Sequence, residues 1–205
     1  MVAEIKVPFI NHDQIKNFAE DFLQKYHPED IIPIPIEEII DLKLKLDIIP
    51  VPGLHNLIDT DGFITSDLTS IFVEDYVYQN RPCRYRFTLA HEIGHFVLHK
   101  DIYIQHKFNS IDGWMSFIDF FPEKERSLFE WQANEFAGLI LVPSRHLEKR
   151  LRYNIKRIKE IGIQNKNIIF DQTVELLAQD FVVSREVIQR RIKRELEKGT
   201  IKIVF

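Results

Sequence analysis

Apolar residues recur at helical spacing near the start of the chain. Over residues 12–26 they fall three or four positions apart, which predicts an amphipathic helix that ends at His27-Pro28 and packs on the core. Its apolar positions are Ile15, Phe18, Ala19, Phe22, Leu23 and Tyr26. A shorter helix is predicted over residues 34–41, with Pro35 in the first turn, where proline is tolerated.

The pattern then becomes strand-like. Residues 44–51 alternate apolar and polar positions until two prolines interrupt them, which predicts a strand at a sheet edge. Residues 57–65 and 70–76 carry β-branched and aromatic side chains on either side of a turn near Asp67. An edge strand of such a sheet could hold an extended substrate by strand addition.

Two apolar helices follow the predicted sheet. Residues 87–97 are apolar on most sides, which is typical of a buried helix, and Thr88 is a candidate N-cap. A second apolar helix begins at Glu130 and stops at Pro143. The connection between them, residues 101–121, carries aromatic side chains that either wall a substrate cleft or pack as a satellite of the core.

Composition narrows the class of protein. The 205 residues suit one domain, or one domain with a small appendage, and 45% hydrophobic content is enough for a sizeable core. A net charge of −4 gives no global electrostatic reason to bind nucleic acid or an anionic membrane. Cys83 is the single cysteine, so no intramolecular disulfide can form. Without a leader or an apolar run of about 18–20 residues, we expect a cytoplasmic protein that binds no membrane.

The first candidate chemistry lies at residues 91–95, His-Glu-Ile-Gly-His. On a helix, His91 and His95 lie one turn apart and point the same way, so their imidazoles can bind one metal ion. Glu92 is offset around the helix, where it can reach a water on the metal. This is the H-E-x-x-H arrangement of zinc-dependent proteases. Gly94 costs about 1 kcal/mol relative to alanine in a helix, which a close contact beside the metal would explain.

A catalytic zinc ion needs three protein ligands and one open position. The class that continues as H-E-x-x-H-x-x-G-x-x-H is excluded, because Leu98 and Asp101 occupy the later positions. His99 lies a further turn along the helix, where a role in capping or in orienting a ligand suits it better than sharing the ion.

Glu130 is the stronger candidate for the third ligand. Asn134 lies one turn later on the same helix face, where it could orient a ligand histidine by hydrogen bonding its other ring nitrogen. Glu135 is the competing carboxylate, but its phase around the helix differs, and we interpret it as a solvated charge.

These two segments resemble a known family. Phe87-Thr-Leu-Ala-His-Glu-Ile-Gly-His95, then Glu130-x-x-Ala-Asn-x-Phe-Ala137 and a Leu-Val-Pro ending at Pro143, are similar to the ImmA/IrrE family of metallo-endopeptidases, over about residues 30–195. The resemblance implies zinc ligands at His91, His95 and Glu130, a catalytic glutamate at Glu92, and the family's asparagine at Asn134. Gln132 stands where many members carry glutamate.

The resemblance also implies a fold and a substrate. The fold class would be α+β: a gluzincin-like zinc peptidase core, made of a small sheet and the active-site helices, with a C-terminal helix-turn-helix-like segment. The implied substrate is a helix-turn-helix transcriptional repressor inside the cell.

The C-terminal region supports a second hypothesis. Residues 174–192 predict two short helices joined by a tight turn, with Ser184 capping the second. Such a pair either binds DNA through its second helix or serves as a scaffold. The second helix is locally basic, with Arg185, Arg190, Arg191, Lys193 and Arg194. We therefore divide the chain into a zinc metallopeptidase-like domain, 1–165, and a helix-turn-helix-like helical segment, 166–205.

Two functions follow from these features. In the first, zinc (or manganese), one ion per chain, polarises the scissile carbonyl while Glu92 takes a proton from the attacking water. In the second, a metal-stabilised module sequesters a repressor or binds DNA through residues 172–195, without hydrolysis. Glu92 favours the enzyme, because a structural zinc site has no use for such a glutamate.

Overall fold

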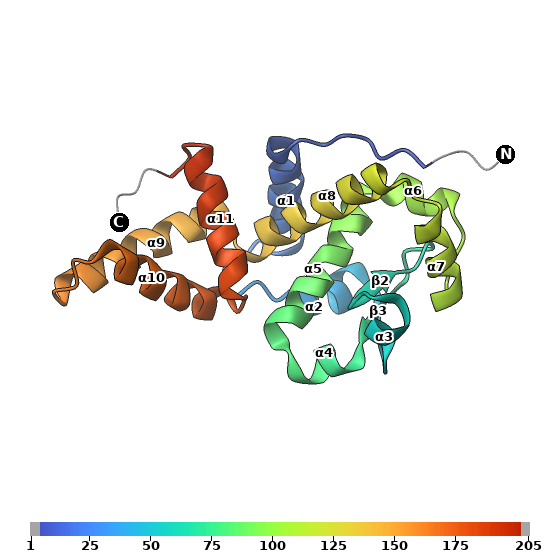
Figure 1. The fold of residues 1–205 in the computed structure, drawn as a ribbon, viewed down its shortest axis with the longest axis horizontal. Coiled ribbons are helices and arrows are strands. Elements are labelled where there is room, and N and C mark those ends of the chain that lie inside the picture. The colour runs from blue at the N-terminus through green and yellow to red at the C-terminus, as the bar shows by residue number, and fades with distance from the viewer. Residues whose placement is uncertain (1–4, 202–205) are drawn as a thin grey trace.

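The computed structural model describes residues 5–201, and it is mostly helical with one small sheet (Figure 1). Its elements are α1 (His12–Tyr26), α2 (Ile36–Glu38), the π-helix η1 (Ile39–Leu44), β1 (Asp47–Val51), α3 (Leu54–Ile58), β2 (Gly62–Ile64), β3 (Ser70–Glu74), α4 (Asp75–Asn80), α5 (Pro82–Leu98), α6 (Lys100–Gln105), α7 (Ile111–Asp119), α8 (Glu123–Leu141), α9 (Ser144–Glu160), α10 (Lys166–Phe181) and α11 (Arg185–Glu197). The fold class is therefore α+β, as the sequence predicted.

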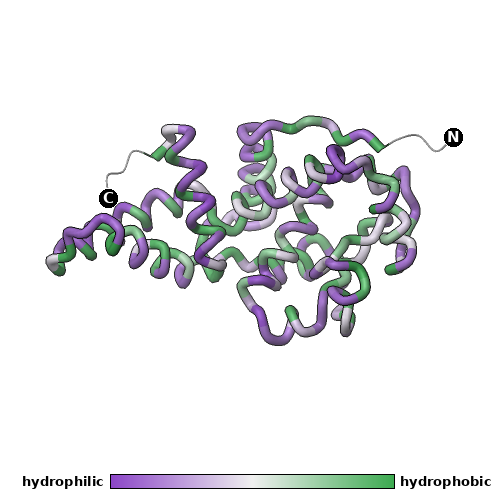
Figure 2. Tube along the Cα trace, in the orientation of Figure 1, coloured by the Kyte–Doolittle hydropathy of each residue, from purple (hydrophilic) through white to green (hydrophobic). Residues whose placement is uncertain are grey.

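Helix α1 spans the predicted residues. It begins with a capping box, in which the side chain of Asn11 accepts from the backbone of Gln14 and the side chain of Gln14 accepts from the backbone of Asn11. Its apolar face, which includes Ile15 and Phe22, is buried against α8. Hydrophobic and hydrophilic residues alternate along the helices of Figure 2, as expected for helices with one buried face.

The second predicted helix starts later than expected. Residues 34 and 35 precede α2, which begins at Ile36 and continues as a π-helix to Leu44. Proline explains the later start, because the residue before a proline is disfavoured in helical conformation and Ile34 precedes Pro35.

The sheet has the strand order β1-β3-β2, with β1 parallel and β2 antiparallel to β3. Strand β1 lies at an edge, as predicted, and Pro50 is accommodated there. It begins at Asp47 and not at residue 44, because Leu44 still belongs to the π-helix. The predicted turn is present, with Asp67 accepting from the side chain of Thr65 and the backbone of Thr69. The prediction of a strand from residue 57 was wrong, because residues 54–58 form α3 and β2 is only three residues long.

Helix α5 begins at Pro82, which takes the first helical position. The prediction that Thr88 caps the helix was therefore wrong: Thr88 is a buried residue inside α5. It packs where β2 crosses the helix, and a Cβ at Gly62 would lie 2.8 Å from its methyl carbon. This close approach requires glycine, and it places β2 directly against α5.

The aromatic side chains between α5 and α8 belong mainly to the hydrophobic core. Of its six aromatic side chains, four are buried: Tyr103, Phe108, Phe117 and Phe121. Their rings pack on one another and on Phe129 of α8. The satellite-packing interpretation therefore describes these four residues better than a cleft wall.

Three helices, α9 to α11, form the C-terminal part (Figure 1). Ser184 caps α11 as predicted, since its hydroxyl accepts from the backbone of Val187. Arg191, one of the basic residues of this helix, does not lie on its exposed surface. Its side chain is buried on α8, where it donates to the carbonyl of Val142 and pairs with Glu195.

Candidate metal centre

The site forms where α5 crosses α8, the most extensively packed pair of helices. Gly94 lies at the crossing, and a Cβ there would be 2.9 Å from the Cα and 3.0 Å from the carbonyl oxygen of Ala133. The close contact that the sequence suggested for this glycine is thus with the backbone of the neighbouring helix. Gly94 lies between the two histidines, and Ala133 follows soon after Glu130. Because Gly94 has no side chain, the two helices come close enough for the candidate ligands to meet.

Three of the predicted residues meet at this crossing. His91 Nε2 lies 3.0 Å from His95 Nε2 and 3.1 Å from Glu130 Oε2, and His95 Nε2 lies 3.8 Å from Glu130 Oε1. His95 is buried, His91 is mostly buried, and Glu130 is 41% exposed. Among the described residues, this is the one group of His, Cys, Asp and Glu side chains close enough to hold a metal ion.

The outer ring nitrogens of both histidines are engaged in hydrogen bonds. His91 Nδ1 lies 3.2 Å from the Oδ1 of Asn134, and His95 Nδ1 lies 2.9 Å from the Nδ1 of His99. An amide oxygen only accepts, so His91 donates from Nδ1. The Nε2 atoms of both rings therefore face Glu130.

This donor set fits a divalent zinc ion. Tetrahedral zinc with nitrogen and oxygen ligands at about 2.0–2.2 Å separates those ligand atoms by about 3.3–3.6 Å. The observed separations of 3.0, 3.1 and 3.8 Å bracket that range. Because the Glu130 side chain is 41% exposed, this donor set lies close to the protein surface.

Glu92 lies next to His91 and is nearly fully buried. Its Oε2 accepts a hydrogen bond of 2.9 Å from the backbone N–H of Ile64 in β2, so the sheet holds the carboxylate in place. Burial raises the pKa of Glu92 to about 7, with the positive charge of His91 opposing the rise and Glu130 adding to it. A carboxyl group with such a pKa can both accept and release a proton near neutral pH.

The histidines titrate in opposite directions. Burial lowers the pKa of His91, but the hydrogen bond and negative charge of Glu130 outweigh it and raise this pKa to about 9. Burial, followed by the charge of His91, holds the pKa of His95 well below its ordinary value. Burial lowers the pKa of His99 to about 4, against the opposing hydrogen bond to Gln132.

Glu135 does not behave as a solvated charge, and that interpretation was wrong. It accepts from His12 of α1 at 2.7 Å and from Arg194 of α11 at 3.0 Å, so it joins three helices. These partners hold the pKa of Glu135 below its usual range despite burial. Its separation in sequence from His12 and Arg194 hid this role.

Sequence reasoning also missed Phe129 and the role of Gln132. Phe129 stacks on both His95 and His99, with ring centroids 4.1 and 4.2 Å away. Gln132 is fully buried and accepts from His99. The i, i+3 spacing of Phe129 and Gln132 on α8 was the available signal, but it became meaningful only once α8 was placed against α5.

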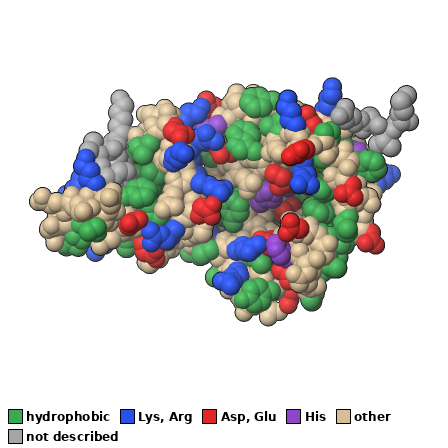
Figure 3. All heavy atoms as spheres, viewed as in Figure 1, with side chains coloured by type: hydrophobic (Ala, Val, Ile, Leu, Met, Phe, Trp, Pro, Cys, Tyr) green, Lys and Arg blue, Asp and Glu red, His purple; other side chains and the backbone are tan. Residues whose placement is uncertain are grey.

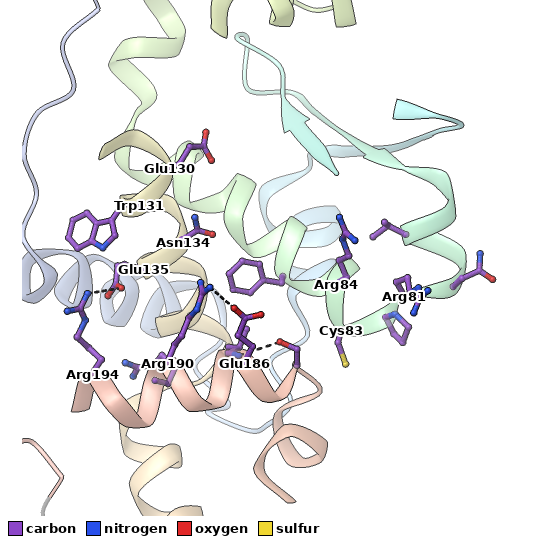
Figure 4. Close-up of a pocket in the computed structure, with 18 of the residues that line it drawn as sticks. Arg81, Cys83, Arg84, Glu130, Trp131, Asn134, Glu135, Glu186, Arg190 and Arg194 are labelled. Atoms are coloured by element: carbon purple, nitrogen blue, oxygen red, sulfur yellow. Dashed lines mark hydrogen bonds and ion pairs between the residues drawn. The ribbon is translucent and has the colours of Figure 1, made fainter. Parts of the chain in front are cut away.

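A groove of about 1130 Å³ leads from this site to α11. Glu130 and Asn134 line one end, and Arg190 and Arg194 of α11 line the other (Figure 4). In the space-filling view, histidine and acidic side chains lie side by side near the middle of this face, with basic side chains around them (Figure 3). An extended peptide that occupied the groove would pass beside Glu130, the one candidate ligand that lines it.

The H-E-x-x-H helix supplies two histidines, and the helix that crosses it supplies a glutamate as the third candidate ligand. This arrangement defines a site of metallopeptidase type. The model of the Peptidase M78 family, described as the IrrE N-terminal-like domain, matches residues 57–193. The chain belongs to this family, which confirms the resemblance seen in the sequence. Membership suggests a metallopeptidase and implies a metal ion, for which His91, His95 and Glu130 are the candidate ligands.

Comparison with solved structures gives a likeness in fold. A Mycobacterium tuberculosis transcriptional regulator matches with a TM-score of 0.55 at 17% sequence identity. The match covers 88% of this chain and 46% of the regulator, so this chain spans about half the regulator's length. No curated protein matched the chain. Within residues 5–201, no helix is long and apolar enough to cross a membrane.

Proposed function

We propose that this protein is a zinc-dependent endopeptidase of the cytoplasm that hydrolyses peptide bonds of a protein substrate, a helix-turn-helix transcriptional repressor. The observation that carries the proposal is the convergence of His91, His95 and Glu130 beside the buried carboxylate of Glu92. One zinc ion per chain is the proposed cofactor, and manganese is the alternative, since imidazole and carboxylate ligands suit both. Asn134 is proposed to orient the ring of His91.

The chain's own residues supply the proton transfers. A bound divalent ion provides Lewis-acid chemistry that polarises the scissile carbonyl. Glu92 takes a proton from the attacking water as its oxygen bonds to the carbonyl carbon. It then passes that proton to the amide nitrogen as the carbon–nitrogen bond breaks. The pKa of about 7 for Glu92 suits both transfers.

The groove and the sheet support an extended protein substrate. The groove passes Glu130, and an edge strand of the sheet offers backbone groups for strand addition. Family membership supports a regulatory protein as the substrate, and a regulator is the fold neighbour. We also propose that residues 1–165 form a gluzincin-like peptidase domain and that residues 166–205 form a helix-turn-helix-like segment.

DNA binding by α11 has little support from its charges. Each basic side chain of this helix lies within about 4 Å of a carboxylate; the pairs are Arg185–Asp171, Arg190–Glu186, Arg191–Glu195, Lys193–Glu197 and Arg194–Glu135. Phosphate contacts would have to compete with these partners. We expect no gel shift of duplex DNA even at low salt; a shift that weakens as salt rises would restore the DNA-binding alternative.

The test of the enzyme compares wild type, Glu92→Gln and Glu130→Gln, each loaded with zinc and incubated with candidate repressors. We expect wild type to cleave, Glu92→Gln to retain zinc without cleaving, and Glu130→Gln to lose both properties. Glu160→Gln is the matched control and should behave as wild type, because this side chain at the end of α9 is exposed. Cleavage by Glu92→Gln at the wild-type rate would overturn the mechanism. If the zinc-loaded wild type cleaves none of the repressors, a repressor is not the substrate.

A further inference from the structure

A chain of hydrogen bonds runs from His95 away from the candidate metal site. His95 Nδ1 lies 2.9 Å from His99 Nδ1, and His99 Nε2 lies 2.8 Å from Gln132 Oε1. Gln132 Nε2 in turn donates to the backbone carbonyl of Pro8 at 2.9 Å. The chain thus links three parts of the fold: α5, α8 and the segment that precedes α1.

The backbone carbonyl sets the direction of every bond in this chain. A carbonyl oxygen only accepts, so Gln132 must turn its NH₂ group toward Pro8 and its oxygen toward His99. That oxygen also only accepts, so His99 must donate from Nε2. In a neutral ring the other nitrogen is then an acceptor, so His99 Nδ1 accepts and His95 Nδ1 donates. His95 is left with its lone pair on Nε2, facing His91 and Glu130.

The surroundings keep His99 neutral. Its side chain is 1% exposed, and the ring of Phe129 covers both it and His95. Both of its ring nitrogens are engaged, by His95 and by the uncharged amide of Gln132, so neither hydrogen bond supplies a negative charge. Burying an imidazolium in such a place is costly.

The Pro8 carbonyl is itself held in place. The backbone N–H of the preceding residue, Val7, donates to the carboxylate of Glu125 on α8 at 2.7 Å. Val7 is thus bonded to the same helix that carries Gln132. This contact keeps the Pro8 carbonyl close to the side-chain amide of Gln132.

We propose that Gln132 and His99 are positioning residues that hold His95 as the tautomer whose Nε2 lone pair is free to bind the metal. This inference rests on the proposed function, in which His95 binds the metal ion. It extends that function because it gives a role to a glutamine and a histidine that are not among the proposed metal ligands. Losing an outer partner of a metal-binding histidine lowers metal affinity about 10–100-fold.

The first measurement needs neither metal nor substrate. Long-range ¹H–¹⁵N spectra of the metal-free wild type at neutral pH report which nitrogen of each neutral histidine carries the proton. We expect the proton of His95 on Nδ1 and that of His99 on Nε2. A His95 ring protonated on Nε2 would overturn the proposal, whether or not any variant folds.

The second measurement is zinc affinity by chelator competition. Gln132→Leu removes the acceptor, so the Nδ1–H tautomer of His95 should lose its dominance and zinc affinity should fall about 10–100-fold. Gln132→Glu keeps both contacts when its buried carboxyl group is protonated, because the O–H can donate to Pro8 and the carbonyl oxygen can accept from His99. In that form it should retain both the tautomer and an affinity within a few-fold of wild type. Equal affinity losses in both variants would indicate a merely structural role and refute positioning.

Ser144→Ala is the matched control, because it removes a hydrogen bond to buried Glu195 in another part of the fold. It should leave zinc affinity unchanged. The outcome is separable from that of the proposed function. An inactive wild type that binds zinc and shows the expected tautomers would refute the peptidase while leaving the positioning role intact.

Discussion

Replacing Gly94 with alanine tests the contact that brings the candidate ligands together. The added Cβ would lie 2.9 Å from the Cα and 3.0 Å from the carbonyl oxygen of Ala133, whereas carbon atoms in contact prefer about 3.5–4.0 Å. Two of the three nearest atoms are backbone, so no side-chain rotation relieves the clash, and α5 must move away from α8.

The size of the effect follows from two opposing contributions. Overpacking a dense core costs about 1–3 kcal/mol, while glycine to alanine in a helix recovers about 1 kcal/mol. Because backbone atoms cause the clash, the upper part of the first range applies, and we expect a net loss of about 1–2 kcal/mol. For a chain of this size that lowers Tm by about 2–8 °C. Zinc affinity should fall as well, because the histidines lie on one helix and Glu130 on the other.

The assays are thermal unfolding of the metal-free protein and chelator competition for zinc. Gly138→Ala on α8 is the matched control, since its Cβ would meet only the side-chain carbons of Arg191, the nearer at 3.3 Å. We expect this control to change stability less and to bind zinc as wild type does. A Gly94→Ala protein that is as stable as wild type and binds zinc equally well would show that the close contact with Ala133 is not needed.

Three further predictions concern charged groups. In the metal-free protein the pKa of His91 is raised to about 9, so below that pH a proton competes with zinc for this ring. Zinc affinity should therefore rise about tenfold per pH unit from 6.5 toward 9. A zinc affinity that does not change with pH in competition assays would contradict this prediction. Arg191→Met leaves Glu195 buried without its cation and should cost about 3–5 kcal/mol in urea unfolding, so a loss below 1 kcal/mol would exclude a strong pair. Burial raises the pKa of Glu195, but hydrogen bonds from Ser144 and Thr200 and the charge of Arg191 outweigh it and lower this pKa to about 2. The resulting stabilisation is present above pH 4.5 and is lost as pH falls toward 2, and Glu195→Gln should flatten this acid dependence in unfolding experiments.

Much of the local structure was readable from the sequence. Helix α1, the edge strand β1 and the Ser184 cap each depend on residues a few positions apart, so periodicity and capping rules predicted them. The errors at Thr88 and at residues 57–58 concern where elements begin. The start of α5 had a local signal, since Pro82 takes its first helical position. The start of β2 depends on the short helix α3, which the strand-like composition of residues 57–65 did not reveal.

The relative placement of His91, Glu92 and His95 follows from the sequence alone, because residues four apart on one helix face the same way in any fold. The sequence also marked Glu130 and Asn134 as a pair on a second helix. Three contacts depend on the tertiary fold: Glu130 with the histidines, Gln132 with His99, and Arg191 with α8. Each joins residues more than thirty positions apart, so its geometry depends on how the helices pack.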